Sequence, residues 1–232
     1  MSKTLIAYTI HLFTVSGVFL SFLALNSAVN GNITFVFIFL ALALFVDGVD
    51  GTLARWADVK LYTPKINGEV LDNIIDFLNY VFVPAFVLYT LDFISDDFKL
   101  ISIFIILSSS CYTFANNDLK TKDYYFSGFP ALWNIVLFYF YLVQTSQAVN
   151  LVVIVLLTIA TFIPFKFTHP MRVIEHRKLT IFFLLVWMIT SSIMLYQRHY
   201  DLYSLDLNYY IWMISNLYFM YTTLKRTYVE KN

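Results

Sequence analysis

Four aspartates in two short motifs are the residues of this sequence whose types and spacing could carry chemistry. Asp47 and Asp50 lie toward the end of one long apolar run, and Asp72 and Asp76 lie at the start of the next one. In a helix, residues three or four positions apart share a face, so each pair would form a stripe on its own helix. Two antiparallel helices would then turn four carboxylates toward one another near one membrane surface.

Carboxylates in this setting require positive charge nearby. An ionised aspartate at the centre of a membrane helix costs roughly 2.5 to 3.5 kcal/mol on the most lenient scale, so four would not persist without compensation. Hard oxygen ligands suit Mg2+ or Mn2+, and two such ions would neutralise four carboxylates while leaving positions for phosphate oxygens. The alternative is pairing with Arg55, Lys60 and Lys65 at a solvated helix end. We favour the metal site because one arginine cannot satisfy four acids.

Two motifs of soluble proteins fail at the same residues. The phosphatase motif D-x-D-G-T would need aspartate at position 48, which is Gly48, and it would need a parallel sheet. A calcium-binding loop would need oxygen ligands at positions 46 and 48, where Val46 and Gly48 stand. The acids therefore belong to neither motif.

The composition places these acids in a membrane protein. Of the 232 residues, 59% are hydrophobic and 19% are aromatic, and the mean hydropathy is +0.71. This is more apolar surface than one globular core can bury, which predicts an all-α polytopic membrane protein. The 15 lysines and arginines balance the 15 aspartates and glutamates, so the net charge gives no indication of a nucleic-acid partner, and none is expected.

Apolar runs of about 20 residues, the length that spans a bilayer, predict about eight membrane helices. Their expected ranges are 5–25, 33–54, 67–91, 99–115, 127–145, 148–165, 179–196 and 208–224. Cytoplasmic segments of membrane proteins concentrate lysine and arginine. With both termini in the cytoplasm, eight helices leave only Lys99 and Arg198 of the 15 basic residues outside. The expected architecture is one integral membrane catalytic domain over residues 1–232.

The two aspartate motifs resemble the signature of a known family. Residues 47–55 and 68–76 match the pattern D-x-x-D-G-x-x-A-R followed by G-x-x-x-D-x-x-x-D of the CDP-alcohol phosphotransferases. Most of that family has a shorter spacer between the two parts than residues 56–67. The longer spacer is similar to that of a bacterial subgroup, the phosphatidylcholine synthases. Further stretches similar to this subgroup are 11–17, 126–134 and 166–173.

The resemblance implies a fold, a reaction and a set of catalytic residues. The implied reaction joins CDP-diacylglycerol and choline into phosphatidylcholine and CMP, at the cytoplasmic face of the bacterial inner membrane. It implies that Mn2+ or Mg2+, expected as two ions, is held by Asp47, Asp50 and Asp72. Asp76 is implied as the general base for the alcohol, with a share in metal binding. Members of the family are commonly homodimers, so a homodimer surrounded by membrane lipids is expected.

Residues beside the acids are expected to contact CDP-diacylglycerol. Gly51 and Ala54 would let the nucleotide lie against the second helix, and Gly68 would permit close approach where the third helix begins. Arg55 would clamp phosphate, and its alternative role is pairing with Glu69 or with lipid phosphate.

A second basic segment, residues 166–178, has two interpretations. In the first, it fixes the topology and attracts anionic lipid, at about 1 kcal/mol per charge near the surface. In the second, His169 and Arg172 reach the substrate phosphates. The sequence does not favour either interpretation.

Aromatic side chains are expected to hold choline, because its quaternary ammonium group has no hydrogen-bond donor and is attracted to aromatic faces. The candidates are Tyr80, Tyr125 and Trp133. Core packing or anchoring at the membrane interface is the alternative role for each of them.

Two other functions are consistent with parts of this pattern. The first is a sister phosphatidyltransferase with another acceptor, such as serine, glycerol phosphate or inositol phosphate. A phosphorylated acceptor would require additional cationic side chains in the cavity. The second is a cation transporter, in which membrane acids form an ion path. Such a path should continue toward the outer face, whereas the motif acids cluster at the inner end, which favours the enzyme.

Overall fold

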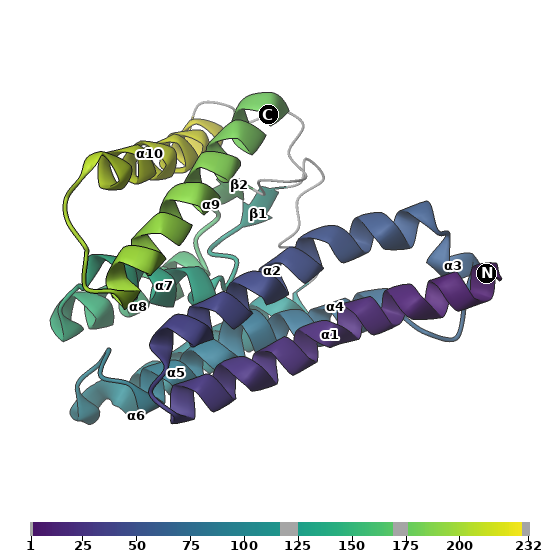
Figure 1. Cartoon of the computed structure of the whole chain (residues 1–232), viewed down its shortest axis with the longest axis horizontal. Helices are drawn as coiled ribbons and strands as arrows, with labels where there is room; N and C mark the ends of the chain where they lie inside the picture. Colours follow the sequence, from purple (N-terminus) through teal and green to yellow (C-terminus); the bar gives the residue numbers. More distant parts are fainter. Residues whose placement is uncertain (1, 117–124, 169–175, 229–232) are drawn as a thin grey trace. The chain divides into compact units, whose positions relative to one another are not determined.

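The computed structural model describes residues 2–116, 125–168 and 176–228, and most of them are helical (Figure 1). The chain forms two compact units. Unit 1 comprises Met1–Ser110 and Leu132–Phe138, and unit 2 comprises Cys111–Ala131 and Tyr139–Asn232. The expectation of a single catalytic domain stays a prediction.

Unit 1 is built from long apolar helices. Its elements are α1 (Lys3–Val29), α2 (Ile33–Trp56), α3 (Val59–Tyr62), α4 (Gly68–Phe77), the π-helical turn η1 (Leu78–Phe82), α5 (Val83–Thr90), most of α6 (Asp96–Ala115) and the start of α7 (Trp133–Val143). α1 begins after Ser2, whose hydroxyl accepts a hydrogen bond from the Leu5 amide at 3.2 Å. It packs along α2, and α4, η1 and α5 follow one another without a break.

Unit 2 combines helices with a small antiparallel sheet. Its elements are the end of α6, β1 (Tyr125–Ser127), the end of α7, α8 (Gln147–Ala160), β2 (Lys166–Thr168), α9 (Arg177–His199) and α10 (Leu207–Tyr228). The register pairs Tyr125 with Thr168, Phe126 with Phe167, and Ser127 with Lys166. The Lys166 amide also donates to Thr227 Oγ1 of α10 at 2.9 Å. The sheet therefore joins two stretches that carry the family resemblance.

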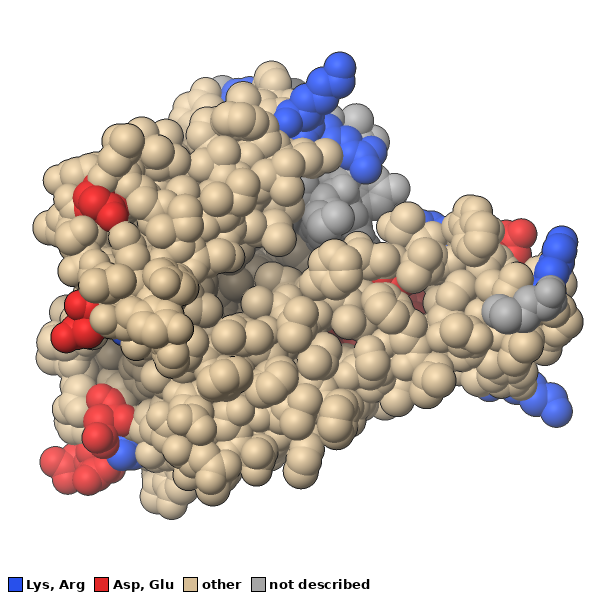
Figure 2. Space-filling view, in the orientation of Figure 1, with Lys and Arg blue, Asp and Glu red and all other residues tan. Residues whose placement is uncertain are grey.

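Among the described residues, five helices are long and apolar enough to cross a membrane: α1, α2, Gly68–Thr90, α6 and α9. α7 and α8 are shorter apolar helices, and α10 is not among the five. Charged side chains are sparse on the face shown in Figure 2. These helices indicate a multi-pass membrane protein. The count of eight spans and the cytoplasmic location of both termini stay predictions.

The segment before α7 differs from the sequence-based expectation. A helix was expected from residue 127, but α7 begins only at Trp133 and is preceded by β1 and extended chain. Two residues contribute to this difference: Gly128 has a φ of +87° and Pro130 lacks an amide hydrogen, so neither favours a helix. The Gly128 amide instead donates to the Phe165 carbonyl at 2.8 Å. The all-α prediction was thus wrong for β1 and β2.

A network of aromatic and polar side chains joins α7, α9 and α10 within unit 2. The hydroxyl of the half-buried Tyr139 donates to Asn216 Oδ1 and accepts a hydrogen bond from Trp187 Nε1 at 2.8 Å. Trp212 Nε1 donates to Ser191 Oγ at 3.0 Å. Hydrogen bonds of this kind join membrane helices at modest energy, about 0.6 kcal/mol on average.

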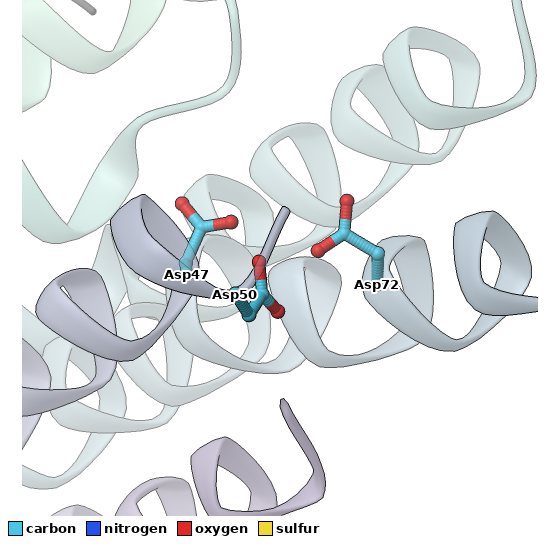
Figure 3. Close-up of side chains that lie close together, drawn as sticks. All are labelled: Asp47, Asp50 and Asp72. Carbon is cyan, nitrogen blue, oxygen red and sulfur yellow. The ribbon is translucent and has the colours of Figure 1, made fainter. Parts of the chain in front are cut away.

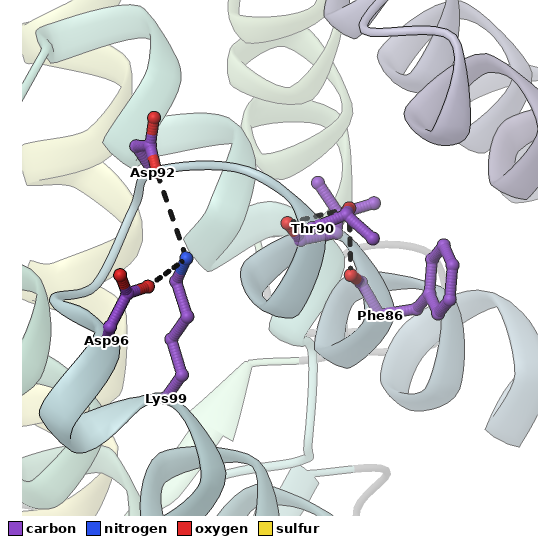
Figure 4. A network of polar contacts seen from close by, with 6 residues as sticks. Phe86, Thr90, Asp92, Asp96 and Lys99 are labelled. Carbon is purple, nitrogen blue, oxygen red and sulfur yellow. Dashed lines mark hydrogen bonds and ion pairs between the residues drawn. The ribbon is translucent and has the colours of Figure 1, made fainter.

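The two basic residues that the predicted topology places outside both have local partners. Lys99 Nζ lies 2.7 Å from Asp96 Oδ1 and 3.7 Å from Asp92 Oδ1, at the start of α6 (Figure 4). Arg198 Nε and Nη2 donate to the Leu142 carbonyl at 2.8 and 2.6 Å, at the end of α7. Both cations are therefore held by contacts within their own unit.

Candidate active site

Three of the four motif aspartates converge between α2 and α4. Asp47 and Asp50 come from α2 and Asp72 from α4, and one carboxylate oxygen of each lies within 4.8 Å of the others. Figure 3 shows the three carboxyl groups turned toward a common space. Asp50 is buried, with 6% of its surface exposed, and the other two are half-buried. The helical spacing predicted four facing carboxylates, and the structure brings three of them together; their role in metal binding stays a prediction.

The spacer between α2 and α4 reverses the chain so that the two halves of the motif meet. Val59 of α3 packs into a small apolar cluster with Ala7 and Ile10 of α1. Asn67 then caps α4, because its Oδ1 accepts hydrogen bonds from the Glu69 and Val70 amides at 3.1 and 3.2 Å. The longer spacer thus forms a folded element of its own against α1.

His11 ties this spacer to α1. Its Nε2 lies 3.0 Å from Thr63 Oγ1, and both residues are buried. The Thr63 hydroxyl donates its single hydrogen to the Val59 carbonyl at 2.9 Å, so it accepts from His11. The proton of neutral His11 is therefore on Nε2. This contact was not identified from the sequence, where a polar residue in an apolar run is its only signal.

Tyr80 is the second residue whose role sequence reasoning missed. It lies in η1, directly beyond α4, and 7% of its surface is exposed. Its hydroxyl donates a hydrogen bond to Asp47 Oδ2. Tyr80 was expected to bind choline because it lies one turn beyond Asp76. That expectation stays a prediction, and the hydrogen bond to Asp47 is the contact that the structure describes.

The space around the glycines differs, as the contacts of a Cβ atom added at each of them show. At Gly17 of α1 it would lie 2.7 Å from Ile75 Cγ2, and at Gly128 it would lie 2.3 Å from the Thr161 carbonyl oxygen. At Gly51 the nearest atom is Arg55 Nη1 at 3.3 Å, the end of a flexible side chain. The protein itself therefore requires the first two glycines, whereas Gly51 has space beside it that a substrate could occupy.

The other expected contacts of CDP-diacylglycerol have different surroundings. An added Cβ at Gly68 would lie 3.7 Å from His11 Cε1, an ordinary contact, so this helix start is also open. Ala54 packs against the Ala7, Ile10 and Val59 cluster, which gives it a structural role. Arg55 is exposed at the end of α2, and its Nη2 donates to Thr52 Oγ1 at 3.1 Å. Binding of substrate by these residues stays a prediction.

The remaining predicted site residues are not part of the carboxylate cluster. Asp76 lies one helical turn beyond Asp72 in α4 and is half-buried. Trp133 is 1% exposed, and its Nε1 donates to Ser110 Oγ at 2.9 Å, which is a packing role within unit 1. Tyr125 begins β1, and its side chain lies outside the description. His169 and Arg172 lie outside the described residues.

The donor set of the cluster fits a divalent cation. Carboxylate oxygens are the ligands that Mg2+ and Mn2+ prefer, and three of them can reach one point here. The same three charges repel one another when no cation is bound. A buried acid such as Asp50 is costly unless it is paired or coordinates a metal, so the arrangement is suited to hold positive charge.

Comparison with known proteins places this geometry in a family. Residues 5–220 match the CDP-alcohol phosphatidyltransferase family. The chain is similar to a phosphatidylcholine synthase of Pseudomonas aeruginosa, with 40% identity over 221 residues that cover 95% of this chain and 92% of the relative. It is 42% identical to one of Mesorhizobium japonicum, over 82% of this chain and 71% of the relative. One of Borreliella burgdorferi is 40% identical, over 76% of each chain. This chain belongs to the CDP-alcohol phosphatidyltransferase family.

Proposed function

We propose that this protein transfers the phosphatidyl group of CDP-diacylglycerol to choline and releases phosphatidylcholine and CMP. The observation that carries the proposal is the convergence of Asp47, Asp50 and Asp72 from the two halves of the family motif. The choice of choline is supported by the relatives, which are named phosphatidylcholine synthases and cover most of this chain.

The residues of the site divide into three tasks in this proposal. Asp47, Asp50 and Asp72 hold Mn2+ or Mg2+, with two ions expected, and bound metal neutralises the charge of the pyrophosphate. Asp76 accepts the proton of the choline hydroxyl when the choline oxygen attacks phosphorus. Gly51 and Gly68 leave room for the nucleotide at the two helices, as the space around both glycines supports.

The site is proposed to face the cytoplasm from the bacterial inner membrane. Lys60 and Lys65 are exposed on the connection between the two halves of the motif, and Arg55 is exposed at the end of α2 just before it. Basic residues at this position favour the cytoplasmic side and the anionic lipid surface there. A single catalytic domain, eight spans and a homodimer remain parts of this proposal.

The acceptor is tested by offering purified protein CDP-diacylglycerol, Mn2+ and a panel of labelled alcohols. Choline, serine, glycerol phosphate and inositol phosphate are compared at equal concentration, and the lipid product is identified by mass spectrometry. Labelled phosphatidylcholine alone is expected. Another labelled phospholipid would identify a sister enzyme, and the absence of any product together with cation flux in vesicles would favour a transporter.

Replacing Gly51 by alanine is expected to lower activity while leaving stability unchanged or raised. Alanine is favoured over glycine inside a helix by about 0.5 to 1 kcal/mol, and the Arg55 side chain can move aside. The alanine methyl group would fill the space beside residue 51. The affinity for CDP-diacylglycerol is therefore expected to fall, by about tenfold if 1.4 kcal/mol of binding free energy is lost. Thermal unfolding and the CDP-diacylglycerol KM are measured together.

Gly17→Ala is the matched control for Gly51→Ala, because it is also a glycine inside a helix. Its added Cβ would lie 2.7 Å from Ile75 Cγ2, so overpacking should cost about 1 to 3 kcal/mol of stability. Unchanged activity of Gly51→Ala, or a loss of stability as large as that of Gly17→Ala, would contradict a substrate contact at Gly51.

Labelling from one side of the membrane is expected to distinguish eight spans from fewer. In a Cys111→Ser background, single cysteines at Tyr62, Asp96, Ser146 and Ser204 are treated with an impermeant maleimide in spheroplasts. With eight spans, Tyr62 is protected and the other three react. Ser146 is decisive because it joins the short helices α7 and α8. Protection of Ser146 would mean that these two helices do not cross the membrane.

A further inference from the structure

The membrane segment that carries Asp72 and Asp76 contains a π-helical turn, η1, directly after the motif. The Val83 amide donates to the Leu78 carbonyl, five residues earlier. Pro84 explains this turn: it has no amide hydrogen, and its ring would clash with the carbonyl of Tyr80 in a regular α-helix. Turns of this type often occur at functional sites.

The π-turn allows successive residues to face different neighbours. Asn79, Tyr80 and Val81 are all buried, although they follow one another in the sequence. Asn79 contacts α1, because its Oδ1 accepts a hydrogen bond from Ser21 Oγ at 2.7 Å. Tyr80 contacts α2, because its hydroxyl donates to Asp47 Oδ2. The turn is thus held on one side by α1 and reaches the carboxylate cluster on the other.

The contact with α1 is close enough to fix the position of the turn. A Cβ added at Gly17 would lie 3.4 Å from Asn79 Nδ2 and 2.7 Å from Ile75 Cγ2, so α1 and this segment pack tightly. Tyr80 is 7% exposed, and its ring has little freedom to move. The Tyr80 hydroxyl that donates to Asp47 is therefore held in a fixed position.

We infer that Tyr80 is a positioning residue that orients the Asp47 carboxylate for metal binding. A carboxylate has two oxygens with about four acceptor sites, so a hydrogen bond at Oδ2 is compatible with a cation on the same group. Partners that hydrogen-bond to metal ligands fix their orientation, and their loss typically lowers metal affinity by about 10- to 100-fold. The inference rests on the proposed function only in assigning a divalent metal to the cluster.

Tyr80→Phe tests this role because it removes the hydroxyl and keeps the ring. The dissociation constant for Mn2+ is expected to rise about 10- to 100-fold. Activity should recover at saturating Mn2+, with the KM for choline unchanged, since the ring and Asp76 remain. Binding is measured directly by electron paramagnetic resonance of free Mn2+ with purified full-length protein, so the readout does not depend on turnover.

Tyr139→Phe is the matched control, because the Tyr139 hydroxyl also donates a hydrogen bond to a side-chain oxygen, in this case the Asn216 amide oxygen within unit 2. It should bind Mn2+ like the wild type. Mn2+ binding by Tyr80→Phe within about twofold of the wild type would overturn the inference, as would an equal loss in Tyr139→Phe. A wild type that binds no Mn2+ would overturn the metal site itself, whereas tight Mn2+ binding without phosphatidyl transfer would contradict the proposed function and leave the Tyr80 result standing.

Discussion

Asp50→Asn is expected to lower phosphatidyl transfer by about a thousandfold or more while the protein stays folded. Metal-assisted charge stabilisation supplies several kcal/mol, and each 1.4 kcal/mol is a factor of ten in rate. Asparagine has nearly the same shape as aspartate but no charge, so the buried site can accommodate it. Removing one of three mutually repelling carboxylates should leave metal-free thermal stability equal or higher. The rise of the unfolding temperature with Mn2+ should be lost.

Asp72→Asn should behave in the same way, because Asp72 supplies the third carboxylate from α4. Asp92→Asn is the matched control, since the Asp92 side chain is 95% exposed and its Oδ1 lies 3.7 Å from Lys99 Nζ. It should retain full activity and full Mn2+ stabilisation. Full turnover of the wild type in EDTA, or near-normal activity of Asp50→Asn, would contradict the metal site.

Asp76→Asn is expected to abolish the chemical step and to leave much of the affinity for CDP-diacylglycerol. An amide cannot accept the proton of the choline hydroxyl, and general-base catalysis contributes typically about 100- to 10,000-fold. The metal ligands Asp47, Asp50 and Asp72 remain in this variant, and Asp76 is not one of the three clustered carboxylates. Binding and catalysis should therefore separate.

Asp47→Asn provides the contrast, because it removes a member of the cluster. It should weaken Mn2+ binding and CDP-diacylglycerol binding together. Both variants are compared by metal-dependent binding of CDP-diacylglycerol and by their rates at saturating choline. An equal loss of lipid binding in the two variants would mean that Asp76 is chiefly a metal ligand, and the base would have to be another residue.

The sequence predicted those features that follow from helical periodicity. Long apolar runs correspond closely to α1, α2, α6, α9 and the segment Gly68–Thr90. Three of the four carboxylates that the helical spacing was expected to bring together do cluster, on α2 and α4. Such patterns are local, so they can be read without knowing the partners of each helix.

Features that depend on distant contacts were not predictable in the same way. β1 and β2 pair segments far apart in the sequence, and each is only three residues long. The late start of α7 depends on a positive φ at Gly128 and a hydrogen bond to Phe165. Gly128 and Pro130 nevertheless indicated a break before α7, because glycine and proline often interrupt apolar runs.

The hydrogen bond from Tyr80 to Asp47 depends on several layers of structure at once. Pro84 favours a π-turn, the turn must pack against Ser21 of α1, and α2 must present Asp47 in register. Pro84 could have indicated the turn from the sequence. The partner of the Tyr80 hydroxyl could not have been identified from the sequence, because it depends on how η1 and α2 are placed beside each other.

The most direct measurement of the proposed activity is the stoichiometry of the reaction in a defined membrane. Purified protein in nanodiscs containing CDP-diacylglycerol receives isotopically labelled choline and Mn2+, and labelled phosphatidylcholine and CMP are quantified by mass spectrometry. We expect one CMP for each labelled phosphatidylcholine, with both products absent in EDTA and in Asp50→Asn. Release of CMP without labelled phosphatidylcholine, or labelled phosphatidylcholine formed by Asp50→Asn as fast as by the wild type, would contradict a choline phosphatidyltransferase that acts through the three clustered aspartates.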